Sequence, residues 1–288
     1  MLSAGSLGMV TLQLMKITRR SALLAASGAL LVPAVSFAGA HARFAVEEIE
    51  IEMESLDPAH DGLRLVQLSD IHVGAFTEDE QIISAVRAVV ALAPDLIVLT
   101  GDFVTVKHDP FERVGELLAA LPDVPKVAVL GNHDHWTHPV ELKQVLQHAN
   151  IEVLQNENTE LRLNHSAFRI IGVDDGYTKH DDATEALKGV PTNGSRLILT
   201  HTPSAANRIP PLGLLCLSGH THGGHFVVPG LTDAILHVAG QPYVRGRYEA
   251  NGNHLYVNRG LGAGRTGHLP RVNSMPEVSL FTLRRSAA

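Results

Sequence analysis

The chain has 288 residues, 45% of them apolar and 18% charged, which predicts a globular protein with a sizeable core and excludes a disordered or collagen-like chain. Its one cysteine, Cys216, excludes an intramolecular disulfide and a metal site built from thiolates. The net charge is −7 over the whole chain and −10 without the first forty residues, which hold three basic residues and no acid, so nucleic acid is not expected as a structural partner. The 17 histidines outnumber Phe, Tyr and Trp together and indicate that imidazole is used functionally.

The first forty residues resemble an export signal. Arg19-Arg20 stands just before an apolar, alanine-rich run over residues 22–38, and small residues follow at 38–40. We interpret residues 1–40 as a twin-arginine-type signal for the twin-arginine export machinery, with the folded protein exported to the periplasm or cell envelope. The alternative is an uncleaved membrane anchor, because the run has about the minimum length of a span, but its alanines, glycine and Pro33 weaken that interpretation.

Short apolar runs alternate with helix-like segments over the rest of the chain, which predicts one α/β domain at residues 41–288. The runs typical of buried strands are residues 63–69, 95–100, 126–130, 196–200 and 214–218. Thr77 and Glu80 have the spacing of a capping box and predict a helix with one apolar face, and Asp109 is expected to open a second helix in the same way. Pro139 suits the first turn of a third helix, and short strands with glycine-rich loops are expected after residue 225.

Polar side chains follow five of these predicted strands. Asp70 and His72 follow the first, Asp102 the second, Asn132 and His133 the third, His201 the fourth, and His220 and His222 the fifth. Any one of them alone is typical of a turn or of a satisfied histidine. Because ligands bind outside the carboxyl ends of the strands in open α/β sheets, the five segments are together expected to converge on one site.

The residue types fit a site for two divalent cations. A carboxylate can bridge two divalent cations, and His and Asn complete shells that suit Mn, Fe, Zn or Mg. Two such cations about 3.5–4 Å apart can clamp phosphate oxygens and bind a water between them. The cations lower the pKa of that water, so hydroxide is available for in-line attack at neutral pH.

The segments and their order resemble the calcineurin-like metallophosphoesterase family, over residues 62–283. The matching motifs are Asp70-Ile71-His72, Gly101-Asp102, Gly131-Asn132-His133-Asp134, His201 and Gly219-His220-Thr221-His222. The resemblance implies a four-layer α-β-β-α sandwich with two mixed sheets and a dinuclear metal site at the carboxyl ends of the strands. Gly260-Leu261-Gly262 and Pro276-Glu277, together with the signal, point to an exported bacterial phosphodiesterase branch.

The resemblance also implies a role for each site residue. One cation is expected on Asp70, His72 and His222, the other on Asn132, His201 and His220, with Asp102 bridging them. His133 is expected to stabilise the transition state or protonate the leaving alkoxide. Asp134 is expected to orient the imidazole of His133.

The expected function is that of a dinuclear metal-dependent phosphodiesterase in which metal-bound hydroxide attacks a small-molecule, lipid or cell-envelope phosphoester. One alternative is a phosphomonoesterase or a pyrophosphatase of lipid- or nucleotide-linked precursors. Another is a non-catalytic metal- or cell-wall-binding protein, but neither His133 nor Asp134 is needed merely to hold metal. Peripheral association with the membrane or the cell wall is a further expectation.

The sequence pattern does not assign a role to several other residues. His135 and His225 depart from what the resemblance leads us to expect, and each either lines the substrate cleft or is inert. Trp136 is either a wall of the cleft or a packing residue. Loop residues that could line the cleft are His108, Asp109 and His268, and one or two of Arg245, Arg247, Arg259, Arg265 and Arg271 could hold a distal phosphate, although most are expected at the surface. Cys216 is expected in the core.

Overall fold

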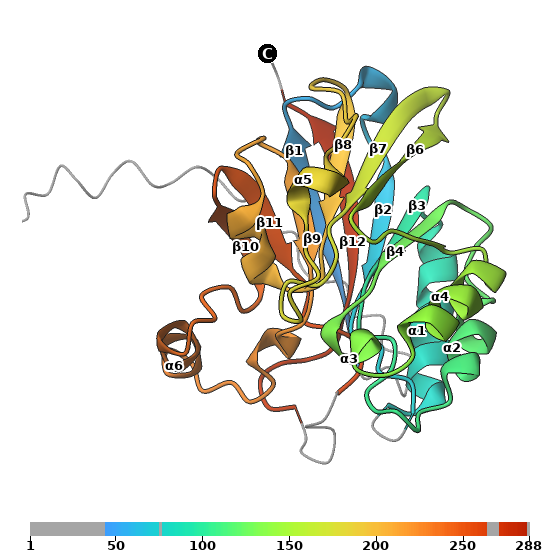
Figure 1. Cartoon of the computed structure of the whole chain (residues 1–288), viewed down its shortest axis with the longest axis vertical. Helices are drawn as coiled ribbons and strands as arrows, with labels where there is room; N and C mark the ends of the chain where they lie inside the picture. The colour runs from blue at the N-terminus through green and yellow to red at the C-terminus, as the bar shows by residue number, and fades with distance from the viewer. Residues whose placement is uncertain (1–43, 75–76, 264–270, 287–288) are drawn as a thin grey trace, which may run out of the picture. The chain divides into compact units, whose positions relative to one another are not determined.

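The computed structural model of the protein describes residues 44–74, 77–263 and 271–286 (Figure 1). The predicted signal, Arg265 and His268 lie outside these residues. Within the described part of the chain, no helix combines the length and the apolar character that a membrane span needs.

The described strands form two mixed sheets of six. The first sheet has the order β1 (Ala45–Met53), β12 (Glu277–Arg285), β2 (Arg64–Leu68), β3 (Leu96–Thr100), β4 (Lys126–Val129) and β5 (Glu152–Val153). The second has the order β10 (Gly246–Ala250), β11 (Asn253–Val257), β9 (Leu215–Ser218), β8 (Ser195–Leu199), β7 (Ser166–Gly172) and β6 (Glu157–Leu163). Only the pairs β12–β2, β6–β7 and β10–β11 are antiparallel, so β2–β5 and β7–β9 send their carboxyl ends to common edges.

Both faces of the central strands are buried, which explains why they appear in the sequence as continuous apolar runs. In β3, Leu96 and Val98 pack between the two sheets, while Ile97 and Leu99 pack against helices. Helices α1 (Asp79–Leu92), α2 (Phe111–Leu118) and α4 (Pro139–His148) lie together on that outer face (Figure 1). The second sheet has a thinner outer layer, made by α5 (Ala183–Ala186) and the 3₁₀ turn η2 (Pro203–Arg208). The four layers expected from the resemblance are therefore present.

The predicted strands are found within one residue of their predicted limits, but two predicted helix caps are wrong. The N-cap of α1 is Glu78 and not Thr77, and the Thr77 hydroxyl makes no capping hydrogen bond. Asp109 does not cap α2 either, because its Oδ2 accepts hydrogen bonds from the amides of Thr105 and Val106, at 2.7 and 2.8 Å. Asp109 thus shapes the loop after β3. Pro139 does occupy the first turn of α4, as expected.

The sequence pattern does not predict several of the described elements, among them β1, β6, β7 and α6. Strand β1 alternates glutamates with apolar residues because it is the edge of its sheet, where charged side chains face solvent and discourage pairing with another chain. Helix α6 (Thr232–Val238) lies in the region where only strands and loops are expected, and it buries none of its residues. The remaining short elements are α3 (Asn132–His135), η1 (Pro58–His60) and η3 (His222–Gly224).

The thiol of Cys216 is expected to be unreactive in the native protein. Cys216 lies in β9 with no exposed surface, and burial raises the pKa of its thiol to about 12. At pH 8 only about one such thiol in ten thousand is ionised, and the thiolate is the reactive form. A chromogenic thiol reagent should therefore label the chain only in denaturant. Stoichiometric labelling of the native protein within minutes would contradict this placement.

Candidate metal centre

Two groups of side chains converge where β2, β3, β4, β8 and β9 end. Asp70, His72 and His222 form the first cluster, and Asp102, His201 and His220 form the second; within each, one potential ligand atom per residue lies within 4.8 Å of the others. In the first cluster His72 Nε2 is 3.2 Å from His222 Nε2, and Asp70 Oδ1 is 3.5 Å from His222 Nε2. Segments about 150 residues apart in sequence thus meet at one place.

Asp102 of the second cluster also faces the first cluster, and Asn132 lies against the histidines of the second. The Oδ2 atom of Asp102 is 3.6 Å from His72 Nε2 and 3.3 Å from His201 Nε2. The Oδ1 atom of Asn132 is 3.1 Å from His201 Nε2 and 2.8 Å from His220 Nδ1. All seven residues expected to be ligands are therefore brought together, and one carboxylate oxygen faces both groups.

The backbone at this site is strained. Asp70, His72, Asp102, His220 and His222 all have φ between 49° and 74°, the left-handed region that residues with a Cβ seldom adopt. Each such residue costs on the order of 1–3 kcal/mol, and such conformations cluster at functional sites. The strain is concentrated on five of the seven side chains that converge here, so the fold holds their polar atoms together at a cost in stability.

Neighbouring glycines make this approach possible. A Cβ on Gly131 would lie 2.2 Å from Asp102 Oδ1, and a Cβ on Gly219 would lie 2.3 Å from Asp70 Oδ2. No larger residue fits at either position without moving a carboxylate. Glycine has no Cβ, so it allows the backbone to approach the carboxylates closely at these two positions.

The donor set fits divalent cations. The Nδ1 atoms of His72 and His201 face the carbonyl oxygens of Val104 and Thr100, at 3.2 and 2.7 Å. A carbonyl only accepts, so each Nδ1 carries the hydrogen and leaves a lone pair on Nε2 in the neutral ring. Those Nε2 atoms point at Asp102 and at other ring nitrogens. Nitrogen and oxygen donors gathered in this way are the ligands that zinc, manganese and iron prefer.

The carboxylates of the site favour positive charge, although burial keeps two of its imidazoles neutral. Burial lowers the pKa of His72 to about 3 and that of His220 to about 4, so these rings are neutral at pH 7. Burial also acts against charge on His201, but the carboxylate of Asp102 outweighs it and raises the pKa of His201. Burial acts to raise the pKa of Asp102, but the charge and hydrogen bond of His201 outweigh burial and hold that pKa below its usual range. Burial raises the pKa of Asp70 to about 6. A proton on His201 thus supplies charge that a cation can supply instead.

The ring of His133 lies beside the first cluster, with its centroid 5.1 Å from that of His72. Its Nδ1 is 2.7 Å from the carbonyl oxygen of Thr105, which accepts its hydrogen and leaves Nε2 as the atom able to exchange a proton. Its backbone amide donates to Asp102 Oδ1 at 2.9 Å. The Thr105 carbonyl therefore orients this imidazole, and sequence reasoning cannot detect it because a backbone carbonyl is common to all residue types.

Asp134 contacts backbone amides and not the ring of His133, which the resemblance leads us to expect it to orient. Its carboxylate is fully buried and accepts hydrogen bonds from four backbone amides, those of Asp102, Phe103, Val104 and Gly131, at 2.8–3.3 Å. It makes no hydrogen bond to the ring of His133 in the described structure. A buried carboxylate is best satisfied by several amide donors, and two adjacent loops present them here. Asp134 is therefore a positioning residue that ties the loop after β3 to the loop after β4.

Replacing Asp134 by alanine is expected to lower the free energy of unfolding of the metal-free protein by at least about 3 kcal/mol. The change leaves four buried amides without an acceptor, and each unsatisfied group costs about 1–3 kcal/mol. Urea unfolding followed by circular dichroism measures the loss. Asp123→Ala, which removes an exposed aspartate, should shift the result by no more than about 0.5 kcal/mol. Equal stability of the two variants would contradict the role given to Asp134.

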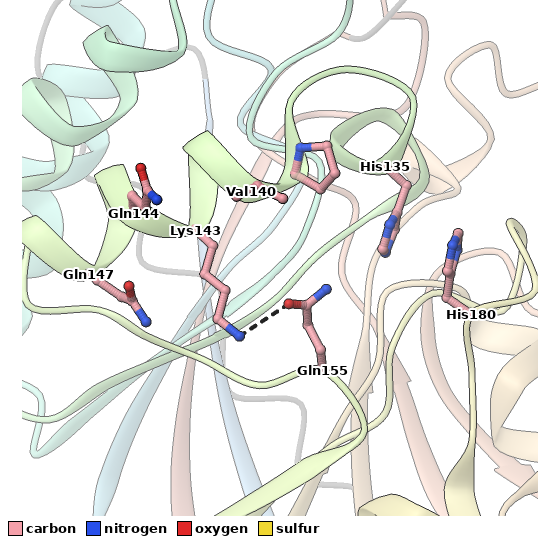
Figure 2. Close-up of a pocket in the computed structure, with 8 residues that line it drawn as sticks. His135, Val140, Lys143, Gln144, Gln147, Gln155 and His180 are labelled. Carbon is pink, nitrogen blue, oxygen red and sulfur yellow. Dashed lines mark hydrogen bonds between the residues drawn. The ribbon is translucent and has the colours of Figure 1, made fainter.

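His135 points away from the ligands. Its ring stacks on His180 with centroids 4.1 Å apart, and its Nε2 is 2.7 Å from Asp174 Oδ1. Burial acts to lower its pKa, but Asp174 outweighs burial and raises it. His135 and His180 form one end of a pocket of about 410 Å³ whose other side is α4, with Lys143 and Gln155 bonded across it at 3.1 Å (Figure 2). His225 lies nearer the ligands, with its ring 6.3 Å from that of His222.

The candidate arginines near the C-terminus contact different groups. Arg245 pairs with Asp233, and Arg259 pairs with Glu277 and Glu47. Among the four candidate arginines that the structure describes, Arg271 reaches the site, because its Nη2 donates to His222 Nδ1 at 3.0 Å. With a cation on Nε2, the Nδ1 atom of His222 would carry the hydrogen and could no longer accept from Arg271. The guanidinium also donates hydrogen bonds to the carbonyl oxygens of Arg259 and Gly262, so the backbone holds it beside the first cluster.

Comparisons with known proteins agree with this geometry. A sequence model of the calcineurin-like phosphoesterase family matches residues 63–224. The chain is 32% identical over 287 residues to an uncharacterized metallophosphoesterase, YkuE, of Bacillus subtilis, covering 93% of this chain and 98% of that one. It is 31% identical to the phosphodiesterase YaeI of Escherichia coli, covering 76% and 82% of the two chains. It is 26% identical to the UDP-2,3-diacylglucosamine pyrophosphatase LpxG of Chlamydia trachomatis, covering 76% and 83%.

Proposed function

Since the chain belongs to the calcineurin-like phosphoesterase family, we propose that this phosphoric ester hydrolase acts on phosphodiesters with two divalent cations in its site. The observation that carries the proposal is the position of Asp102, whose Oδ2 faces both clusters. We assign Asp70, His72 and His222 to one cation. Asn132, His201 and His220 are assigned to the other, with Asp102 shared.

The protein's own groups divide the remaining work. When bound, the cations supply positive charge to the phosphate oxygens and lower the pKa of water. The Asp102 carboxylate holds the two halves of the site at a fixed spacing, and its Oδ1 anchors the amide of His133. The imidazole of His133, held at Nδ1 by Thr105, presents Nε2 to the oxygen that leaves the phosphorus and can give it a proton.

Phosphodiesters are favoured over other phosphate esters by the similarity to YaeI, which is named a phosphodiesterase. The second candidate is cleavage of a pyrophosphate bond in a lipid- or nucleotide-linked compound, and the similarity to LpxG supports it. A non-catalytic metal-binding role is disfavoured because the Thr105 carbonyl fixes the ring of His133 beside the clusters, although His133 is not one of the seven assigned ligands.

The test compares three ester classes with the full-length chain. The protein is stripped of metal, reloaded with Mn, Fe, Zn or Mg, and assayed on bis(p-nitrophenyl) phosphate, p-nitrophenyl phosphate and a nucleoside diphosphate sugar. Fast hydrolysis of the diester with two bound ions per chain supports the proposal. Faster cleavage of the sugar nucleotide favours the pyrophosphatase candidate. No turnover of any of the three despite two bound ions contradicts both.

We further propose export by the twin-arginine route, in line with an exported bacterial branch of the family. Arg19-Arg20 and the apolar run after it support this. Changing both arginines to lysine is expected to retain the protein in the cytoplasm, because the machinery reads the arginine pair. Fractionation and immunoblotting measure the distribution. An unchanged distribution contradicts the route, and wild-type protein found in the membrane fraction indicates an uncleaved anchor or peripheral association.

A further inference from the structure

Two large aromatic side chains stand beside the metal centre with about half of their surface in solvent. Trp136 is 48% exposed and Tyr177 is 53% exposed. The ring of Trp136 lies 5.0 Å from that of His133, and the ring of Tyr177 lies 5.1 Å from that of His220. The two aromatic rings are 5.8 Å apart at 76° to each other. They form a continuous path of rings from the proton-exchanging histidine to a ligand of the second cluster.

The backbone that carries these rings is firmly held. Trp136 is the C-cap of α3, and its amide donates to the carbonyl of Asn132 at 3.1 Å. Tyr177 lies in the loop after β7, where Asp175 accepts hydrogen bonds from Thr178 at 2.7 Å and from Thr202 at 2.5 Å. Thr202 directly follows His201, so the loop is tied to the ligand segment itself. Rings held in this way lose little further freedom when they contact a ligand.

We propose that Trp136 and Tyr177 form a stacking subsite for a flat ring on one ester arm of the substrate. The proposal rests on the proposed function, since it places that arm next to a phosphate held at the metal centre. Two rings at 76° form a corner in which a flat group stacked on one ring turns its edge to the other. Stacking of this kind accepts any aryl group or nucleobase, because all have a π face.

Trp136 is the only tryptophan of the chain, so its fluorescence reports directly on this subsite. The full-length protein loaded with zinc is titrated with phenylphosphonate, cyclohexylphosphonate or methylphosphonate, whose carbon–phosphorus bonds the proposed reaction does not cleave. Phenylphosphonate is expected to shift the emission and to bind about 5- to 20-fold more tightly than methylphosphonate. Tyr177→Ala should reduce that ratio to near one, whereas Tyr177→Phe should keep it. Val90→Ala, which trims an exposed apolar side chain on α1, should also keep it.

Turnover is measured on methyl and phenyl p-nitrophenyl phosphate in the same samples. A higher kcat/KM for the phenyl ester that is lost in Tyr177→Ala supports the subsite. Equal binding of phenyl- and methylphosphonate by the wild-type chain overturns it, even if both esters are hydrolysed. Cyclohexylphosphonate binding as tightly as phenylphosphonate overturns the preference for a flat ring. If no ester is hydrolysed but phenylphosphonate still binds selectively, the proposed function fails and the subsite stands.

Discussion

Replacing Asp102 by asparagine is expected to remove at least one of two bound cations and to reduce phosphodiester turnover by about 10³-fold or more. Asp102 is the one described side chain with an oxygen facing both clusters, 3.6 Å from His72 Nε2 and 3.3 Å from His201 Nε2. Asparagine keeps the size of the side chain but removes the negative charge that balances two adjacent cations. Loss of one electrostatic element of a catalytic site commonly costs about 10²–10³-fold, and here two cations depend on the same group.

Metal content after dialysis, measured by plasma mass spectrometry, and turnover of bis(p-nitrophenyl) phosphate test this prediction. Asp123→Asn, at an exposed aspartate in the loop before β4, serves as the matched control and should keep both ions and full turnover. The Asp102 variant is expected to remain folded, because asparagine retains an oxygen for the amide of His133. An Asp102→Asn protein that keeps two ions and normal turnover would falsify the bridging assignment.

Replacing His133 by alanine is expected to leave both cations bound while kcat falls by about 10²–10⁴-fold, the range typical of general acid–base groups. The side chain of His133 makes its hydrogen bond to the Thr105 carbonyl and has no close polar contact with either cluster, so its removal should not disturb the ligands. The loss should be larger for an alkyl leaving group than for p-nitrophenolate, which leaves without needing a proton.

Metal analysis and the ratio of the two kcat values distinguish this role from a structural one. His148→Ala, at the exposed end of α4, is the matched histidine control and should change neither quantity. An equal loss on both leaving groups, accompanied by loss of metal, would show that His133 supports the ligands and does not serve the leaving oxygen.

Much of the fold follows from local patterns in the sequence. Continuous apolar runs predict β2, β3, β4, β8 and β9 because both faces of these strands are buried, and such strands need apolar residues at every position. Polar residues directly after those runs are predicted to meet, since parallel strands end at one edge. Strand β1 is not among these runs because its glutamates alternate with apolar residues, and its place at the edge of the sheet depends on strands distant in sequence.

At the site, too, the sequence predicted some features and only the tertiary structure decided others. The sequence by itself predicted that eight polar side chains converge, because residue type and position after a strand are local properties. The resemblance to the family implied which seven of them are ligands. Only the tertiary structure decided what Asp134 and His135 contact: four backbone amides in one case, and His180 with Asp174 in the other. Only it placed Trp136 and Tyr177 at the rim of the site. The physical reason is that hydrogen-bond partners and ring contacts come from segments far apart in the chain. In addition, backbone carbonyls orient His133 and His72, and these groups are the same in every residue, so the sequence does not reveal them.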